Sequence, residues 1–169
     1  MILRNFWGFI GGFLAQPLSY GQNKTITGCK NLSGANMVCY TCAQNTSQIG
    51  PFIQNTVSWS KTAVIVGTGD TAVTALDYCL DNDVTSQLSN YSSVLSPSYG
   101  DTNDLFTYTV SGENATGSDI TIKEVGITKQ YNSAVTTYSE FLVAREVLDT
   151  PIVIHDGEAF SFTYVWKQQ

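Results

Sequence analysis

The residues of this chain best suited to chemistry are four cysteines, Cys29, Cys39, Cys42 and Cys79, and a single histidine, His155. Cys39 and Cys42 form a CxxC pair, which could hold structural zinc if two further ligands came from the other cysteines or the histidine. Thioredoxin-like redox chemistry needs the same pair in a βαβ context, which the flanking residues lack. We therefore expect inert thiols or a local disulfide ahead of a metal site, and no cofactor.

Three other patterns lack essential parts of the motifs that they approach. The VGTGD run at 66–70 has neither the lysine of a phosphate-binding loop nor a following Rossmann helix, so it predicts a turn. The acids Asp77, Asp81 and Asp83 could bind calcium, but their spacing matches no EF-hand loop. His155 lies in an IHDGE turn without a GxSxG elbow elsewhere. The sequence therefore predicts a protein that is not an enzyme.

Composition narrows the class of partner. Charged residues make up only 13% of the 169 residues, hydrophobic residues make up 43%, and the net charge is −6. Neutral polar residues must then cover much of the surface, which is typical of extracellular or particle-bound β proteins. A nucleic-acid interface needs clustered Lys and Arg, and this chain has no such cluster. We expect no binding to nucleic acid.

Residues 1–55 predict an apolar N-terminal anchor followed by an extended arm. Residues 1–16, MILRNFWGFIGGFLAQ, are too short for a membrane span, which needs about twenty apolar residues. Three interpretations stay open: an export signal, burial in the chain's own core, and an anchor that docks into a partner subunit. The anchor is favoured. Its contact residues would be Phe6, Trp7, Phe9, Ile10, Phe13 and Leu14.

Residues 56–169 predict a single β-rich domain, because β-branched and aromatic runs alternate with Gly, Asn, Asp and Ser turns. The predicted strands are 57–60, 63–66, 105–110, 119–127, 134–143 and 142–148 (as one bent strand or two), 151–154 and 159–166. Residues 74–80 predict a short helical turn. Such a pattern predicts an all-β fold, an antiparallel β-sandwich of jelly-roll type with an extended N-terminal arm.

The last two strands predict a hairpin across the turn at 155–158. Phe160, Phe162, Tyr164 and Trp166 recur at every second position, so they share one face of the final strand. An aromatic stripe of this kind predicts core rather than a ligand platform.

Three segments together resemble head-fibre, tail-fibre and other virion-associated proteins of tailed bacteriophages: VGTGDTAVTALDYCL (66–80), ITIKEVGI (120–127) and LVAREVLDTPIVIHDGEAFSFTYVW (142–166). The resemblance covers about residues 57–169 and implies a β-sandwich without catalytic residues. The matching positions then form a framework. Gly67 and Gly69 would permit turn dihedrals, Gly126 would permit a bend, and Glu124 and Arg145 would form an ion pair across strands.

The resulting expectation is a structural protein of a bacteriophage virion, located on the capsid as decoration or head fibre, or in the tail. Its partners would be other copies of itself, other virion proteins and, in a fibre, a host-surface receptor. One rival is a secreted or cell-surface adhesive, carbohydrate-binding β-sandwich. The other is a carbohydrate-active enzyme that gathers acids such as Asp77 and Glu124 in a cleft, with raised pKa values.

Overall fold

The computed structural model describes residues 22–41, 62–98, 104–134 and 137–168. Within these ranges the all-β class is confirmed, since eight strands and one short 3-10 turn are the only regular elements. None of these elements is a helix long and apolar enough to cross a membrane. The elements are β1 (Gln22–Lys30), β2 (Asn36–Thr41), β3 (Thr62–Gly67), η2 (Thr85–Gln87), β4 (Ser89–Ser98), β5 (Asp104–Glu113), β6 (Ile120–Ala134), β7 (Thr137–Ile154) and β8 (Ala159–Gln168).

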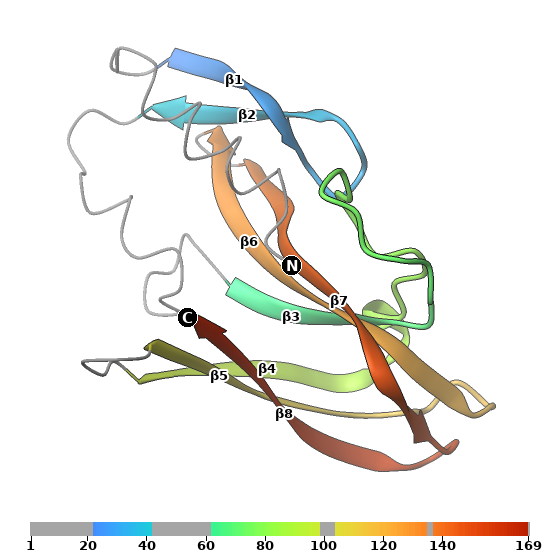
Figure 1. Cartoon of the computed structure of the whole chain (residues 1–169). Coiled ribbons are helices and arrows are strands. Elements are labelled where there is room, and N and C mark those ends of the chain that lie inside the picture. Colours follow the sequence, from blue (N-terminus) through green and yellow to red (C-terminus); the bar gives the residue numbers. More distant parts are fainter. Residues whose placement is uncertain (1–21, 42–61, 99–103, 135–136, 169) are drawn as a thin grey trace. The chain divides into compact units, whose positions relative to one another are not determined.

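The strands form a two-stranded sheet, β1-β2, and two antiparallel three-stranded sheets, β3-β6-β7 and β4-β5-β8. In the last of these β5 lies between β4 and β8 (Figure 1). The chain divides into two compact units. Unit 1 comprises residues 1–62, 72–79 and 126–146, and unit 2 comprises residues 63–71, 80–125 and 147–169. The division passes through β6 and β7, so each of these long strands contributes to both units.

Unit 2 has a core built from buried residues of several strands and loops, and along β5 these residues alternate with more exposed ones. On β5, Phe106, Tyr108 and Val110 are buried, while Thr109 between them is exposed. A strand places successive side chains on opposite faces, so a half-buried strand needs apolar residues only at every second position. The remaining buried apolar residues of this unit are Val64, Ile65, Val66, Leu80, Val84, Leu88, Ile120, Ile122, Val125 and Ile154.

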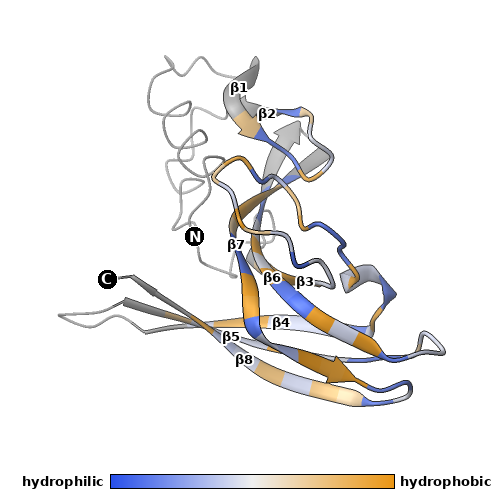
Figure 2. Ribbon diagram, turned by 45° about the vertical axis from the view of Figure 1, so that its right-hand side comes forward, coloured by the Kyte–Doolittle hydropathy of each residue, from blue (hydrophilic) through white to orange (hydrophobic). Residues whose placement is uncertain are grey.

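Unit 1 contains the β1–β2 hairpin. This hairpin lies within residues 1–55, for which the sequence predicts an anchor and an extended arm. The turn between the two strands is closed by Asn31, whose Oδ1 accepts bonds from the backbone N–H groups of Ser33 and Ala35. The backbone N–H of Leu32 donates to the carbonyl of Glu140, 3.0 Å away. Four consecutive residues of β7 are buried in this unit: Phe141, Leu142, Val143 and Ala144. Figure 2 marks the apolar residues of β6 and β7 in orange.

The predicted hairpin of the last two strands is wrong. β7 and β8 belong to different sheets, and β8 pairs with β5 in ten consecutive antiparallel pairs, from Asp104↔Gln168 to Glu113↔Ala159. The turn between them is tight, with Glu158 N–H donating to the carbonyl of His155 and Gly157 at φ +76°. A short turn between two strands of alternating apolar and polar residues is compatible with a hairpin and also with a crossover between two sheets. The local sequence pattern therefore could not distinguish these two connections.

Two other local predictions also differ from the structure. Residues 74–80 contain one hydrogen-bonded turn and no helix. The N–H of Asp77 donates to the carbonyl of Thr74 at 3.3 Å, and the Asp77 carboxylate accepts bonds from the N–H and hydroxyl of Thr74. Residues 134–154 were expected to hold two or three strands. Most of this stretch is the single strand β7, and β6 continues well beyond residue 127.

Candidate functional site

A fully buried carboxylate, Glu124 on β6, organises two loops of unit 2. Its Oε1 accepts hydrogen bonds from the backbone N–H groups of Gly69, at 3.1 Å, and Asn82, at 3.0 Å. Its Oε2 accepts one from the N–H of Asp81, at 3.2 Å. A buried charge must be satisfied by partners of this kind, since an isolated one is strongly disfavoured. Glu124 therefore ties the loop after β3 to the loop before η2.

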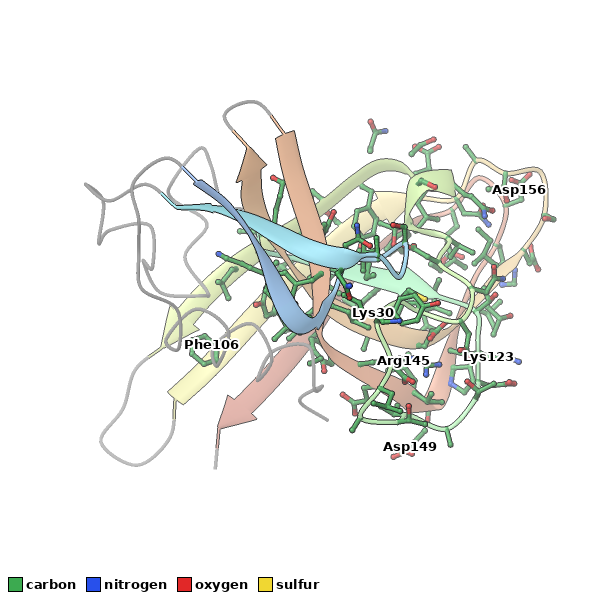
Figure 3. The ribbon with its side chains drawn as sticks, turned by 90° about the horizontal axis from the view of Figure 1, so that it is seen from above. Lys30, Phe106, Lys123, Arg145, Asp149 and Asp156 are labelled. Atoms are coloured by element: carbon green, nitrogen blue, oxygen red, sulfur yellow. The ribbon has the colours of Figure 1, made fainter. Side chains whose placement is uncertain are left out.

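The same two loops are joined by direct contacts. The backbone N–H of Thr68 donates to the carbonyl of Asn82, and the Asn82 Nδ2 donates to the Thr68 hydroxyl, 2.6 Å away. The Thr71 hydroxyl donates to the carboxylate of Asp81. On the exposed side Lys123, labelled in Figure 3, pairs with Asp70 at 2.8 Å. The acidic residues here act mainly as acceptors for the loop backbone.

Gly67 and Gly69 are required for a different reason from the predicted one. Neither has a positive φ, so the predicted role in turn dihedrals is wrong. A Cβ on Gly67 would lie 2.5 Å from Glu124 Oε1, and a Cβ on Gly69 would lie 2.6 Å from the same oxygen and would overlap the Cβ of Asp81. Both glycines let the backbone approach the buried carboxylate closely.

Arg145, labelled in Figure 3, lies on the part of β7 within unit 1. Its side chain is only 1% exposed. Its Nη1 donates to the Asp77 carboxylate at 2.7 Å. Burial by itself would raise the pKa of Asp77, but the hydrogen bonds from Thr74 and Arg145 outweigh it and hold the pKa below its usual 3.8. The ion pair between Glu124 and Arg145 stays a prediction, as does a bend at Gly126, which is buried within β6.

A second polar cluster in unit 2 holds the β5–β6 loop against the β7–β8 turn. Asn114, fully buried, donates through Nδ2 to the carbonyls of Ser118 and Ile154 and accepts through Oδ1 from Thr116. Its backbone bonds to Gly157 and Glu158 of the turn. Sequence reasoning did not identify Asn114 as a structural residue, because its partners lie up to about forty residues away. The only local signal was the residue type, since asparagine is common in turns.

The only histidine belongs to the exposed rim of this cluster. His155 Nδ1 lies 2.9 Å from Asp119 Oδ2. The hydrogen bond to the Asp119 carboxylate, together with the negative charge of that carboxylate, raises the pKa of His155, and the same bond lowers the pKa of Asp119. Both side chains are more than half exposed, so the pair is a surface contact at the tight turn rather than a screened catalytic dyad.

Unit 1 contains two buried titratable groups, Cys29, which the sequence offered as a possible zinc ligand, and Lys129, which sequence reasoning did not single out. Burial raises the pKa of the Cys29 thiol to about 12, so this thiol stays protonated at neutral pH and is a poor nucleophile or metal ligand. Burial lowers the pKa of Lys129 on β6 to about 8. A lysine near neutrality is a typical catalytic amine, but at 4% exposure this one is closed to solvent.

Few of the predicted catalytic and metal-binding residues are brought together. Within the described ranges no group of three or more His, Cys, Asp and Glu side chains is arranged to hold a metal ion. Cys39 lies on β2, and Cys42 lies outside the described residues, as does the whole anchor segment from Phe6 to Leu14. For the rival enzyme, the pKa of Asp77 is lowered, the opposite of what a catalytic acid there would need.

The outer face of the β4-β5-β8 sheet carries three aligned rows of small, uncharged residues. Pairing registers align three rows: Thr109 lies between Val94 and Thr163, Thr107 between Ser96 and Val165, and Ser111 between Ser92 and Ser161. None of these nine residues is charged, and Val94 and Val165 are 52% and 41% exposed. We call this set the Ser/Thr/Val face. Each strand alone shows the alternation in sequence, but only the registers bring the three stripes together.

No family model, no curated protein and no solved structure matches this chain.

Proposed function

We propose that this chain is a structural subunit of a bacteriophage virion, which acts by assembling with other copies of itself and with other virion proteins. The observation that carries the proposal is the Ser/Thr/Val face, which has no charge although the chain has a net charge of −6. Solvated sheet faces normally present charged residues, whereas the centres of protein interfaces are depleted of them. A face of this kind suits contact with protein.

The use of the buried polar groups supports a building role over a catalytic one. Glu124, Asn114 and Arg145 each bond to loop backbone or to a structural acid, and this positions loops rather than a reacting group. The proposal therefore includes the absence of an enzymatic activity. It also includes a sandwich of jelly-roll type, in which the buried apolar residues of β3, β5 and β6 form the interior between two sheets.

The resemblance of residues 57–169 to head-fibre and tail-fibre proteins supports the virion as the location. In this proposal residues 1–55 supply the docking arm and residues 56–169 supply the body, and neither part binds nucleic acid or crosses a membrane. The role on the particle is capsid decoration, a head fibre or a tail component that contacts a host receptor.

Immunogold electron microscopy of purified phage particles, with an antibody raised against residues 57–169, tests the proposal. Gold at discrete positions is the expected result, and its position on head or tail assigns the role. Antigen found only in culture fluid or on cell surfaces would overturn the virion proposal and favour the secreted adhesive domain.

A further inference from the structure

Three of the four outer strands of the two larger sheets carry features that block pairing with another chain. β4 has a register shift between Ser89 and Ser92, a positive φ of 51° at Asn90, and Pro97. Bulges and prolines of this kind are the usual protection of an edge strand, because they interrupt the row of backbone donors and acceptors. β4 is therefore a poor template for an added strand.

β3 is protected by side chains. It is only six residues long, and the N–H of Val64 donates to the Ser93 hydroxyl at 3.0 Å. The N–H of Val66 donates to the Thr85 hydroxyl at 2.9 Å, and the Tyr91 hydroxyl donates to the carbonyl of Val64. Backbone groups that an added strand would need are thus already bonded.

β7 carries charge and proline along its length. Its segment within unit 2 includes Asp149 and Pro151. Both features disfavour addition of a strand at an edge.

β8 has none of these protections. Its ten residues, AFSFTYVWKQ, contain no proline and no glycine, and the first charged residue is Lys167. Its pairing with β5 runs through ten pairs without a register shift. In the described part of the chain β5 is its only neighbouring strand. A long, regular, uncharged edge strand is a template for another strand.

Both faces of β8 are suited to such an extension. Ser161, Thr163 and Val165 belong to the uncharged Ser/Thr/Val face. On the opposite face Phe160 and Phe162 are only half-buried, and their rings stack with centroids 6.0 Å apart. A strand added beside β8 would cover the exposed sides of these rings.

We infer that β8 pairs antiparallel with β8 of a second copy of this chain, which joins two three-stranded sheets into one of six strands. This inference rests on the proposed function and identifies the surface through which copies associate. A register centred on Thr163 makes the pairing self-complementary. Thr163 then faces Thr163 of the second copy, Phe162 faces Tyr164, and Ser161 faces Val165. Aromatic and β-branched cross-strand pairs of this kind stabilise antiparallel sheets.

The charges also agree with this register. Like charges directly opposite one another destabilise a strand pair, and no pair between residues 160 and 166 contains a charge. Lys167 of one copy takes the register position beside Ala159 of the other, whose own partner on β5 is Glu113. Opposite charges therefore share a row. Edge pairing buries less than the roughly 800 Å² per partner of a stable interface, so the dimer is expected to be reversible and concentration-dependent.

Sedimentation velocity of the full chain, from about 1 μM to about 1 mM, tests the inference. The wild-type protein is expected to form a dimer, and Thr163→Lys, which sets two lysines opposite each other, is expected to weaken it at least about tenfold. Val94→Lys is the matched control. It places the same charge in the same row of the same face but on β4, at the far edge of the sheet, and is expected to dimerise as the wild type does.

Hydrogen exchange locates the contact. Amides of residues 159–168 are expected to gain protection with concentration in the wild type and not in Thr163→Lys. Ser161→Lys replaces the test variant if Thr163→Lys does not fold by circular dichroism. A wild type that stays monomeric, a Thr163→Lys protein that dimerises normally, or a Val94→Lys protein that is weakened equally would each overturn edge pairing. Those outcomes leave gold labelling of particles unaffected, so the failure of this inference and of the proposed function are distinguishable.

Discussion

Replacing Glu124 by glutamine tests whether one buried carboxylate holds two loops of this chain in place. The carboxylate accepts three backbone hydrogen bonds, from Gly69, Asp81 and Asn82, at 3.0 to 3.2 Å. Glutamine has nearly the same shape, but one of its two terminal groups is an NH2 donor. That donor must face at least one of the three backbone N–H groups, which then loses its acceptor.

The size of the effect follows from the geometry. With its oxygen in the place of Oε1, glutamine keeps the bonds from Gly69 and Asn82 and loses the bond from Asp81. A buried donor without an acceptor costs about 1–3 kcal/mol, and the two retained bonds lose the assistance of the negative charge. We expect Glu124→Gln to lower the free energy of unfolding by about 2–4 kcal/mol. For a chain of this length that corresponds to a fall in Tm of roughly 5–15 °C.

Urea unfolding followed by circular dichroism measures this loss. The control is Lys123→Gln, which changes the adjacent residue of β6 and removes a pair whose side chains are 37% and 67% exposed. Exposed ion pairs contribute about 0–1 kcal/mol, so the control should stay close to the wild type. The reasoning would be refuted by a loss below about 1 kcal/mol in Glu124→Gln, or by an equal loss in the control.

Three further results are expected. Gly67→Ala should lower the free energy of unfolding by about 1–3 kcal/mol, because its Cβ would lie 2.5 Å from Glu124 Oε1 and 2.7 Å from the carbonyl oxygen of Asn82. The part of this loss that comes from Glu124 should disappear in a Glu124→Ala background, and fully additive losses would contradict that contact. Asp77 has a pKa below 3.8, so it stabilises the fold above that pH, and the stability is lost as pH falls through its lowered pKa. The urea midpoint of Asp77→Asn should therefore fall less than that of the wild type between pH 5 and pH 2, and parallel curves would count against the shift. His155 has a pKa above 6.5, so the stability from its bond to Asp119 is present below 6.5 and is lost as pH rises through the raised value. Proton NMR titration of this single histidine should show its pKa fall in Asp119→Asn, and an unchanged value would exclude the pair.

The framework glycines illustrate how far a sequence pattern can lead. The resemblance selected Gly67, Gly69 and Glu124 as framework positions, and the structure brings all three together in unit 2. The physical role assigned to the glycines was nevertheless wrong. A turn dihedral is a local property that a GTGD run suggests, whereas the need for space beside Glu124 arises between residues 55 positions apart. No local signal distinguishes these two reasons for a glycine.

The sequence by itself determined the secondary-structure class and the faces of single strands. Alternation with period two is a property of adjacent residues, and it is strong in β5 and β8, whose expected positions at 105–110 and 159–166 both lie within observed strands. The composition of the sequence also indicated a low content of charged residues, and the Ser/Thr/Val face has none. These features depend on the geometry of one strand and need no knowledge of its neighbours.

Only the tertiary structure decided which strands pair and which loops meet. β8 pairs with β5, about fifty residues away in the sequence, rather than with β7 across a four-residue turn. Backbone hydrogen bonds use the same N–H and C=O groups in nearly every residue type. The sequence of a strand therefore does not show which other strand it pairs with. The choice depends on which pairing buries the most apolar surface at once. The same cooperative burial places Glu124 beneath two loops and leaves β8 at the edge of its sheet.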